Sequence, residues 1–147
     1  METTEENATP VVVEKSYNAP VAKVWEALTD NEKMKQWYFV LPEFKAEVGF
    51  EFEFTGGDPN GKMYLHKCVV KEVVPDKKLA YSWRYDGYEG DSLVTFELFE
   101  EGTGTRVRVT HTGLETFPAI EAFAPKNFNM GWNAILGSTL RDFVEKA

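Results

Sequence analysis

The chain has 147 residues, of which 43% are hydrophobic and 14% aromatic, enough apolar material for one folded core without help from metal or disulfides. The formal net charge of −8 disfavours binding to nucleic acid and to anionic membranes, because both attract clustered Lys and Arg. Cys68 is the only cysteine, so no intrachain disulfide can form and a cysteine-rich metal site is excluded.

The first nine residues, 1–9, are polar and acidic, and we expect a disordered tail there, followed by one domain over residues 10–147. This start has no apolar region typical of a signal peptide, and no apolar run reaches the roughly 18 residues of a membrane-spanning helix. We therefore expect a soluble, cytoplasmic protein with no insertion into membranes.

The next segments predict one strand and two short helices. Residues 11–18 are rich in β-branched side chains and predict a strand, and residues 19–30 predict a helix with Pro20 in its first turn. Asp30 is expected to cap a second helix over residues 31–38, in which Met34, Trp37 and Tyr38 share one face.

After Pro42 the apolar residues recur at every second position and no longer with helical spacing, which predicts strands. Alternating apolar and polar residues, separated by turn sequences rich in Gly, Pro and Asp, predict an antiparallel meander of strands. The predicted strands cover residues 48–57, 63–74, 79–85, 92–99 and 105–113.

The end of the chain predicts a broken loop and a long amphipathic helix. Residues 114–129 are interpreted as a loop interrupted by Pro118 and Pro125. From Gly131 to Val144 the apolar residues follow helical spacing, with Gly131 at the helix entry and Gly137 off the apolar stripe. The predicted class is α+β: a curved antiparallel sheet of six or seven strands, two short helices after the first strand, and the long helix across the concave face.

With its elements in this order, the sequence resembles the SRPBCC superfamily, whose fold is called START-like or helix-grip. Within it, the chain is similar to single-domain proteins of the group named after the activator of the Hsp90 ATPase. The resemblance runs from Val11 to Val144. It is carried by the segments "APVAKVWEALTDNEKMKQW", "VVPDKKLAYSW", "TRVRVTHTGL" and "GWNAILGSTL".

The resemblance implies a hydrophobic cavity between the sheet and the last helix, of the kind that holds lipid-like, aromatic or polyketide ligands. Large aromatic side chains frame such cavities well, although a solid core would use the same residues. The candidate cavity residues are Trp37, Phe52, Phe54, His66, Tyr81, Trp83, Tyr85, Phe96, His111, Trp132, Leu136 and Leu140.

The two histidines, His66 and His111, fall on the inward side of their predicted strands. They are either polar groups of the cavity, able to act as general acid or base, or satisfied core residues, which we expect more often. A zinc site would need a third ligand beyond Cys68, so no metal and no cofactor are expected. Phe117, Ile120 and Phe123 form either a lid over the cavity or a small satellite core.

Three functions stay open. The first is a module that binds an apolar small molecule in the cavity. The second is an interaction module that modulates a partner, a chaperone of the Hsp90 type, with a role in the stress response; Arg106 and Arg108 on a solvated strand face could mark its partner surface. The third is an enzyme acting on a polyketide-like substrate, which comes last because no residue pattern requires catalysis.

Overall fold

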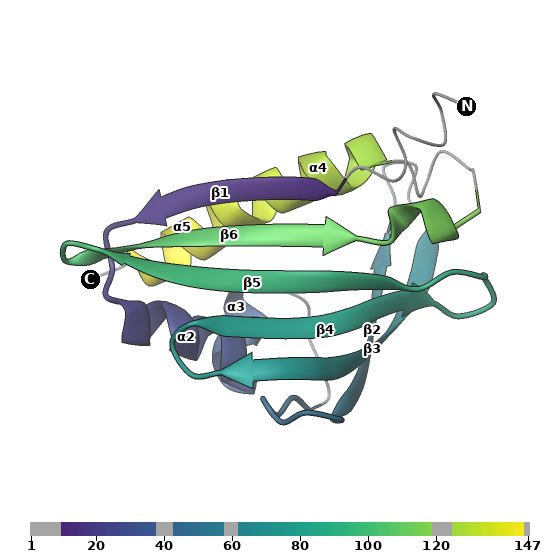
Figure 1. The fold of residues 1–147 in the computed structure, drawn as a ribbon, viewed down its shortest axis with the longest axis horizontal. Coiled ribbons are helices and arrows are strands. Elements are labelled where there is room, and N and C mark those ends of the chain that lie inside the picture. The colour runs from purple at the N-terminus through teal and green to yellow at the C-terminus, as the bar shows by residue number, and fades with distance from the viewer. Residues whose placement is uncertain (1–9, 38–42, 58–61, 119–124, 146–147) are drawn as a thin grey trace.

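The computed structural model describes residues 10–37, 43–57, 62–118 and 125–145. A six-stranded antiparallel sheet, with strands in the order β1-β6-β5-β4-β3-β2, forms the body of the described chain. The sheet curves, and the helices lie on one side of it, the concave side (Figure 1). The expected α+β architecture with two short helices after the first strand is confirmed.

The structure gives bounds for each element. The strands and helices are β1 (Val11–Tyr17), α2 (Val21–Thr29), α3 (Asn31–Trp37), β2 (Glu51–Gly57), β3 (Met63–Val74), β4 (Lys78–Tyr85), β5 (Ser92–Glu101), β6 (Gly104–Thr112), α4 (Pro125–Ala134) and α5 (Leu140–Val144). A 3-10 turn, Leu114–Thr116, follows β6, and a π-helical turn, Ile135–Thr139, joins α4 to α5.

The strands form because apolar and polar residues alternate, which places one side chain of each pair on the concave face. In β3 this alternation holds up to Val70 and then stops at a β-bulge between Val70 and Glu72. A bulge bends its strand and increases the local twist. The first two thirds of β3 therefore contribute a regular row of buried side chains to the concave face. Beyond Val70 no side chain of β3 is buried.

The two short helices form as the sequence predicts. Asp30 caps α3, since its carboxylate accepts hydrogen bonds from the backbone N–H of Glu32 at 2.9 Å and of Lys33 at 3.3 Å. The indole N–H of Trp37 donates to the Ala27 carbonyl at 2.8 Å and so ties α3 to α2. The predicted contribution of Tyr38 lies outside the described residues.

The C-terminal helix begins earlier than the sequence analysis places it. Residues 125–130 are helical, and Gly131 lies inside α4 and is exposed, so its assignment as the helix entry is wrong. Pro125 is the first residue of α4, a position where its missing N–H costs nothing because the first N–H groups of a helix have no partner within the helix. The proline that we interpreted as a loop breaker instead starts the helix.

Gly137 lies in the π-helical turn, off the buried face as expected. In this turn Leu140 N–H donates to the Ile135 carbonyl, five residues back, and not to Leu136. The Leu136 carbonyl accepts a hydrogen bond of 2.7 Å from the Tyr17 hydroxyl of β1. A Cβ on Gly137 would lie 3.6 Å from Cε of Lys15, an ordinary van der Waals contact, so the lysine stem does not by itself require glycine here.

The core beneath the helices has two parts with different composition. Where α2 and α5 pack together against β5 and β6, the buried side chains are aliphatic; we call this region the aliphatic half, formed by Val24, Ala27, Leu28, Leu98, Val107, Leu140 and Val144. Toward β2, β3 and α4 the buried side chains are mostly rings. No helix within the described ranges is long and apolar enough to cross a membrane.

Candidate functional site

The ring-rich part of the concave face brings together most of the predicted cavity residues. All twelve are buried, each with 6% or less of its surface exposed. Nine of them contact one another ring to ring, with centroid distances between 4.5 and 6.4 Å. We call these nine the ring network: Phe52, Phe54, His66, Tyr81, Trp83, Tyr85, Phe96, His111 and Trp132.

Strand pairing explains how residues so far apart in sequence meet. Phe54 of β2 lies directly opposite His66 of β3, and His66 lies opposite Tyr85 of β4. His66 stacks on Phe54 at 4.5 Å, and Tyr85 approaches it at 4.7 Å. Cross-strand ring pairs of this kind are a regular source of sheet stability, so the same contacts that hold the strands together also build the site.

His66 is enclosed by rings and held neutral. Its Nδ1 lies 3.0 Å from the Tyr64 carbonyl oxygen, and Trp83 meets the imidazole edge to face at 4.9 Å. Burial lowers the pKa of His66 to about 4, although its hydrogen bonds to the backbone of Tyr64 and Phe54 act in the opposite direction. At neutral pH this side chain therefore carries no charge.

His111 is fully buried and lies in a chain of hydrogen bonds with a defined direction. The Trp132 indole N–H donates to Nδ1 of His111 at 3.2 Å, so Nε2 carries the proton and donates to Oγ of Ser92 at 2.8 Å. The Ser92 hydroxyl then donates to the Trp83 carbonyl at 2.7 Å. Burial, followed by the proximity of His66, lowers the pKa of His111 to about 3.

This direction does not suit a serine nucleophile. A Ser–His pair needs an unprotonated nitrogen facing the hydroxyl, and a group that orients the histidine by accepting its other N–H. Here Nε2 of His111 donates to Ser92, and Nδ1 accepts from Trp132. The arrangement instead satisfies every polar atom of His111 and Ser92 and fixes the ring of Trp132 over the sheet.

The remaining predicted residues lie around the ring network. Leu136 and Leu140 point from the C-terminal helix into the core and are fully buried, and Trp37 is held against α2. Phe117 is buried and contacts Tyr85 at 5.3 Å and Phe128 at 6.3 Å, while Ile120 and Phe123 of the proposed lid lie outside the described residues.

Several residues of this region were not singled out from the sequence. Ser92 has the same strand parity as Val94 and Phe96, so alternation was a sufficient signal for its inward position. Phe44 precedes the strands without any period, yet its ring packs edge to face on Phe52 at 5.1 Å. Only the folded chain brings Phe44 to this face.

A surface groove of about 780 Å³ lies elsewhere, where the turn between β3 and β4 approaches the start of α2. Its lining includes Val21, Lys78, Glu97 and Phe99, and it includes none of the twelve predicted cavity residues. Acidic and basic side chains both line this groove, among them Asp76, Lys77 and Glu100.

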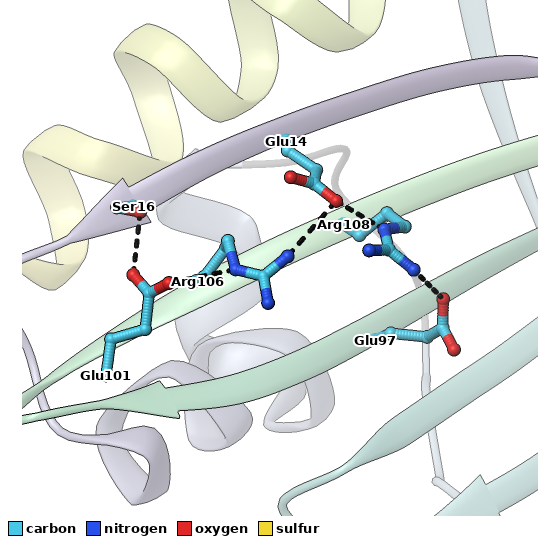
Figure 2. Close-up of polar contacts among 6 residues, drawn as sticks. All are labelled: Glu14, Ser16, Glu97, Glu101, Arg106 and Arg108. Atoms are coloured by element: carbon cyan, nitrogen blue, oxygen red, sulfur yellow. Dashed lines mark hydrogen bonds and ion pairs between the residues drawn. The ribbon is translucent and has the colours of Figure 1, made fainter.

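The convex face carries Arg106 and Arg108, which the sequence offers as a partner surface. Figure 2 shows them paired with carboxylates of neighbouring strands: Arg106 contacts Glu14 at 3.2 Å and Glu101 at 3.0 Å, and Arg108 contacts Glu14 and Glu97. The Arg108 guanidinium holds the pKa of the Glu14 carboxyl below its usual value. The two arginines thus neutralise carboxylates of their own sheet.

Comparison with known proteins identifies the family. The model for "Activator of Hsp90 ATPase homolog 1-like protein" matches residues 18–145. The Hsp90 co-chaperone AHA1 of Saccharomyces cerevisiae is 25% identical over an alignment 119 residues long, and this alignment covers 74% of this chain. The match covers 31% of the yeast protein, so the chain corresponds to about a third of that relative.

Solved structures show the same fold. Protein MLL2253 from Mesorhizobium loti is 29% identical with a TM-score of 0.79, and the match covers 95% of this chain and 98% of that one. Protein CV1439 from Chromobacterium violaceum has a TM-score of 0.80 at 23% identity, covering 94% and 98%. The family match spans β2 to β6 and every helix, and the chain therefore belongs to the Activator of Hsp90 ATPase homolog 1-like family, with the helix-grip fold of the SRPBCC superfamily.

Proposed function

We propose that the protein binds an apolar, ring-containing small molecule against the ring network on its concave face. The observation that carries this proposal is the continuous contact of nine rings from five strands and the C-terminal helix, with polar groups that are buried but uncharged. Binding sites for small molecules are typically concave, aromatic and supplied with a few placed polar groups. The helix-grip fold places such a face between sheet and helix.

The energy of such binding would come from burial of rings. At about 25 cal/mol per Å² of apolar area, a ligand that buries about 200 Å² gains on the order of 5 kcal/mol before the costs of association. Each well-oriented pair of rings adds about 0.5–1.5 kcal/mol. Trp83 lies at the centre of the network, in contact with Phe54, His66, His111 and Trp132, so it should contribute most.

The test is a fluorescence titration with N-phenyl-1-naphthylamine, an uncharged two-ring probe whose emission rises in apolar surroundings. We expect saturable binding at one site, and at least about tenfold weaker binding by the Trp83→Phe variant, in line with the loss of ring contacts. Trp25→Phe is the matched control, because Trp25 lies on α2, outside the ring network, and is only half-buried. Circular dichroism of both variants checks that they are folded.

Two results would count against the proposal. Absence of saturable binding to the wild-type protein would contradict it directly. Equal loss of affinity in both tryptophan variants would place the probe away from the ring network. Native mass spectrometry of protein purified under mild conditions adds an independent measurement, since a bound apolar molecule would appear as a reproducible extra mass that denaturation removes.

The likeness to the yeast co-chaperone favours one second candidate, a module that contacts a chaperone of the Hsp90 type. That likeness covers about a third of the yeast protein, and the activity of the whole protein need not reside in this part. Co-purification with the Hsp90-type chaperone of the same cells would support this function. A variant that loses the probe but still co-purifies would show that the two functions use different surfaces.

A further inference from the structure

We propose that two copies of this chain associate through the convex face of the sheet, about a two-fold axis that runs parallel to the strands between β5 and β6. The interface is separate from the proposed binding of a small molecule, which uses the concave face. Three features of the convex face support it: an uncharged centre, a row of alternating charges beside that centre, and the match between this row and its own reversed copy.

The centre of the convex face consists of uncharged side chains on four neighbouring strands. The registers of β1, β6, β5 and β4 place them in two adjacent rows, the first made of Val12, Thr110, Thr95 and Ala80 and the second of Thr112, Leu93 and Ser82. Val12 is 50% exposed and Leu93 is 37% exposed, and the three threonines are half-buried. The helices lie on the other side of the sheet (Figure 1), so this partly apolar surface faces outward.

A row of alternating charges borders this centre. Directly opposite one another on the same four strands, from β1 to β4, lie Glu14, Arg108, Glu97 and Lys78. Their signs run minus, plus, minus, plus, and Figure 2 shows the first three members in this order. In the next row, Arg106 of β6 lies opposite Phe99 of β5. The convex face therefore carries a defined order of charges across its strands.

This order is complementary to itself under one two-fold rotation. An axis parallel to the strands, between β5 and β6, brings β1 of one copy over β4 of the other, and β6 over β5. Glu14 then faces the partner's Lys78, and Arg108 faces the partner's Glu97. Because the rotation repeats each contact, the charged row contributes four pairs of opposite charge.

The neighbouring rows fit the same rotation. Thr110 faces the partner's Thr95, which brings the uncharged centres of the two copies together. Arg106 faces the partner's Phe99, a ring over which its guanidinium already lies within the chain, 4.4 Å from the ring centroid. Contacts between a guanidinium and an aromatic ring are favourable and become stronger when water is excluded.

The same charges disfavour a different symmetric arrangement. An axis perpendicular to the strands and along the charged row would bring each of its residues against itself. Glu14 would then face the partner's Glu14, and Arg108 would face the partner's Arg108. Like charges placed opposite one another across an interface suppress that arrangement. The order of charges therefore favours the axis parallel to the strands.

The curvature of the sheet makes this a weak interface. Two convex faces touch mainly at their central strands, and interfaces that bury less than about 1,200 Å² belong to weak or transient complexes. We expect a reversible dimer with a Kd on the order of 100 µM, so the protein is a monomer at low micromolar concentration. The net charge of −8 on each copy opposes association, but salt at about 0.15 M screens charges more than about 8 Å apart.

Sedimentation equilibrium of the full chain, from about 5 µM to about 1 mM at about 0.15 M salt, measures the association. We expect a monomer–dimer equilibrium for the wild type. Thr110→Glu places an unpaired charge in the uncharged centre and should raise the Kd at least about tenfold. Thr55→Glu is the matched control, because it changes the net charge equally at an exposed strand position on β2, outside both rows. Its Kd should stay within about twofold of the wild type.

An exchange of charges tests the orientation of the two copies. Lys78→Glu and Glu14→Lys each create two like-charge contacts in a dimer of that variant, and each should raise the Kd at least about tenfold. A mixed dimer of the two variants has opposite charges at both contacts, so its Kd should return to within about threefold of the wild type. Both variants also lose ion pairs within their own sheet, which mixing cannot restore. Recovery in the mixture is therefore specific to contact between chains.

Three results would overturn the proposal. A wild-type chain that stays monomeric up to about 1 mM has no such interface. Equal weakening by Thr110→Glu and Thr55→Glu would place the contact on another face. A mixture of the two charge variants that associates no better than each variant alone would contradict the axis parallel to the strands. Circular dichroism of each variant confirms that it is folded before its association is measured.

Discussion

The two halves of the core solve the same packing problem with different side chains. In the aliphatic half, Leu28, Leu140 and Val144 fill the space between two helices and the sheet and leave almost no surface exposed. In the ring network, large rings pack at centroid distances of 4.5 Å and more and enclose two histidines. Aliphatic side chains contribute only packing, whereas rings with polar edges can also form specific contacts with a bound molecule. In the function proposed above, the ring network binds the ligand and the aliphatic half contributes mainly stability.

Lowering the pH should distinguish the two halves most strongly, because both buried histidines, which resist protonation, lie in the ring network. Their folded-state pKa values, about 4 and about 3, are below the value of 6.5 for an unfolded histidine, so the unfolded state binds more protons between these values. The stability is fully present above pH 6.5 and is lost progressively as the pH falls toward about 4 and 3. By about pH 5 the free energy of unfolding should be lower by on the order of 4 kcal/mol.

Urea unfolding at a series of pH values measures this loss. A His66→Phe variant keeps a ring at this position and removes one of the two titrating groups, so its slope with pH should be about half that of the wild type. A wild-type slope near zero between pH 5 and 6.5 would contradict the assignment of both histidines as neutral core residues.

Truncation in the aliphatic half should cost stability and leave recognition unchanged. Leu28→Ala removes a side chain that is 2% exposed, and we expect the free energy of unfolding to fall by about 2–5 kcal/mol from lost burial and the resulting cavity. The affinity of the folded variant for N-phenyl-1-naphthylamine should stay within about twofold of the wild type. Leu93→Ala, at a position 37% exposed, is the control and should lose much less stability.

Ser92→Ala should have a smaller effect that is confined to the ring network. It leaves the Nε2–H of His111 without its acceptor, which costs about 1–3 kcal/mol of unfolding free energy. It should also shift the fluorescence of Trp132, whose indole is bonded to the same histidine. Ser16→Ala removes an exposed serine that donates to Glu101, and its expected change is within about 0.5 kcal/mol.

The smallest effect is expected on the convex face, which neither half of the core includes. Arg106→Met keeps an apolar stem but removes the guanidinium, which pairs with Glu14 and Glu101 and lies over the Phe99 ring. Exposed ion pairs contribute little and are screened by salt. Thermal unfolding at low and high salt should show a small loss that added salt diminishes, and a large loss that persists at high salt would give these arginines a structural role beyond pairing.

Much of the fold followed from local patterns in the sequence. Alternation in segments such as "FEFEF" determined which side chains are buried, because strand geometry sends successive residues to opposite faces. The cap at Asp30 and the helical stripe from Trp132 to Phe143 are likewise local. The inward direction of His66 and His111 needed nothing more than strand parity.

The tertiary structure decided what depends on neighbours remote in sequence. Proline breaks helices but also begins them, so only the fold showed that Pro125 starts α4. The protonation of His111 depends on Trp132 and Ser92, each about twenty residues away, and no local pattern specifies that direction. The approach of Lys15 to the π turn at Gly137 is a contact between the first strand and the last helix, which no local pattern specifies. Sequence period gives the direction of a side chain, whereas charge state and packing depend on what the folded chain places beside it.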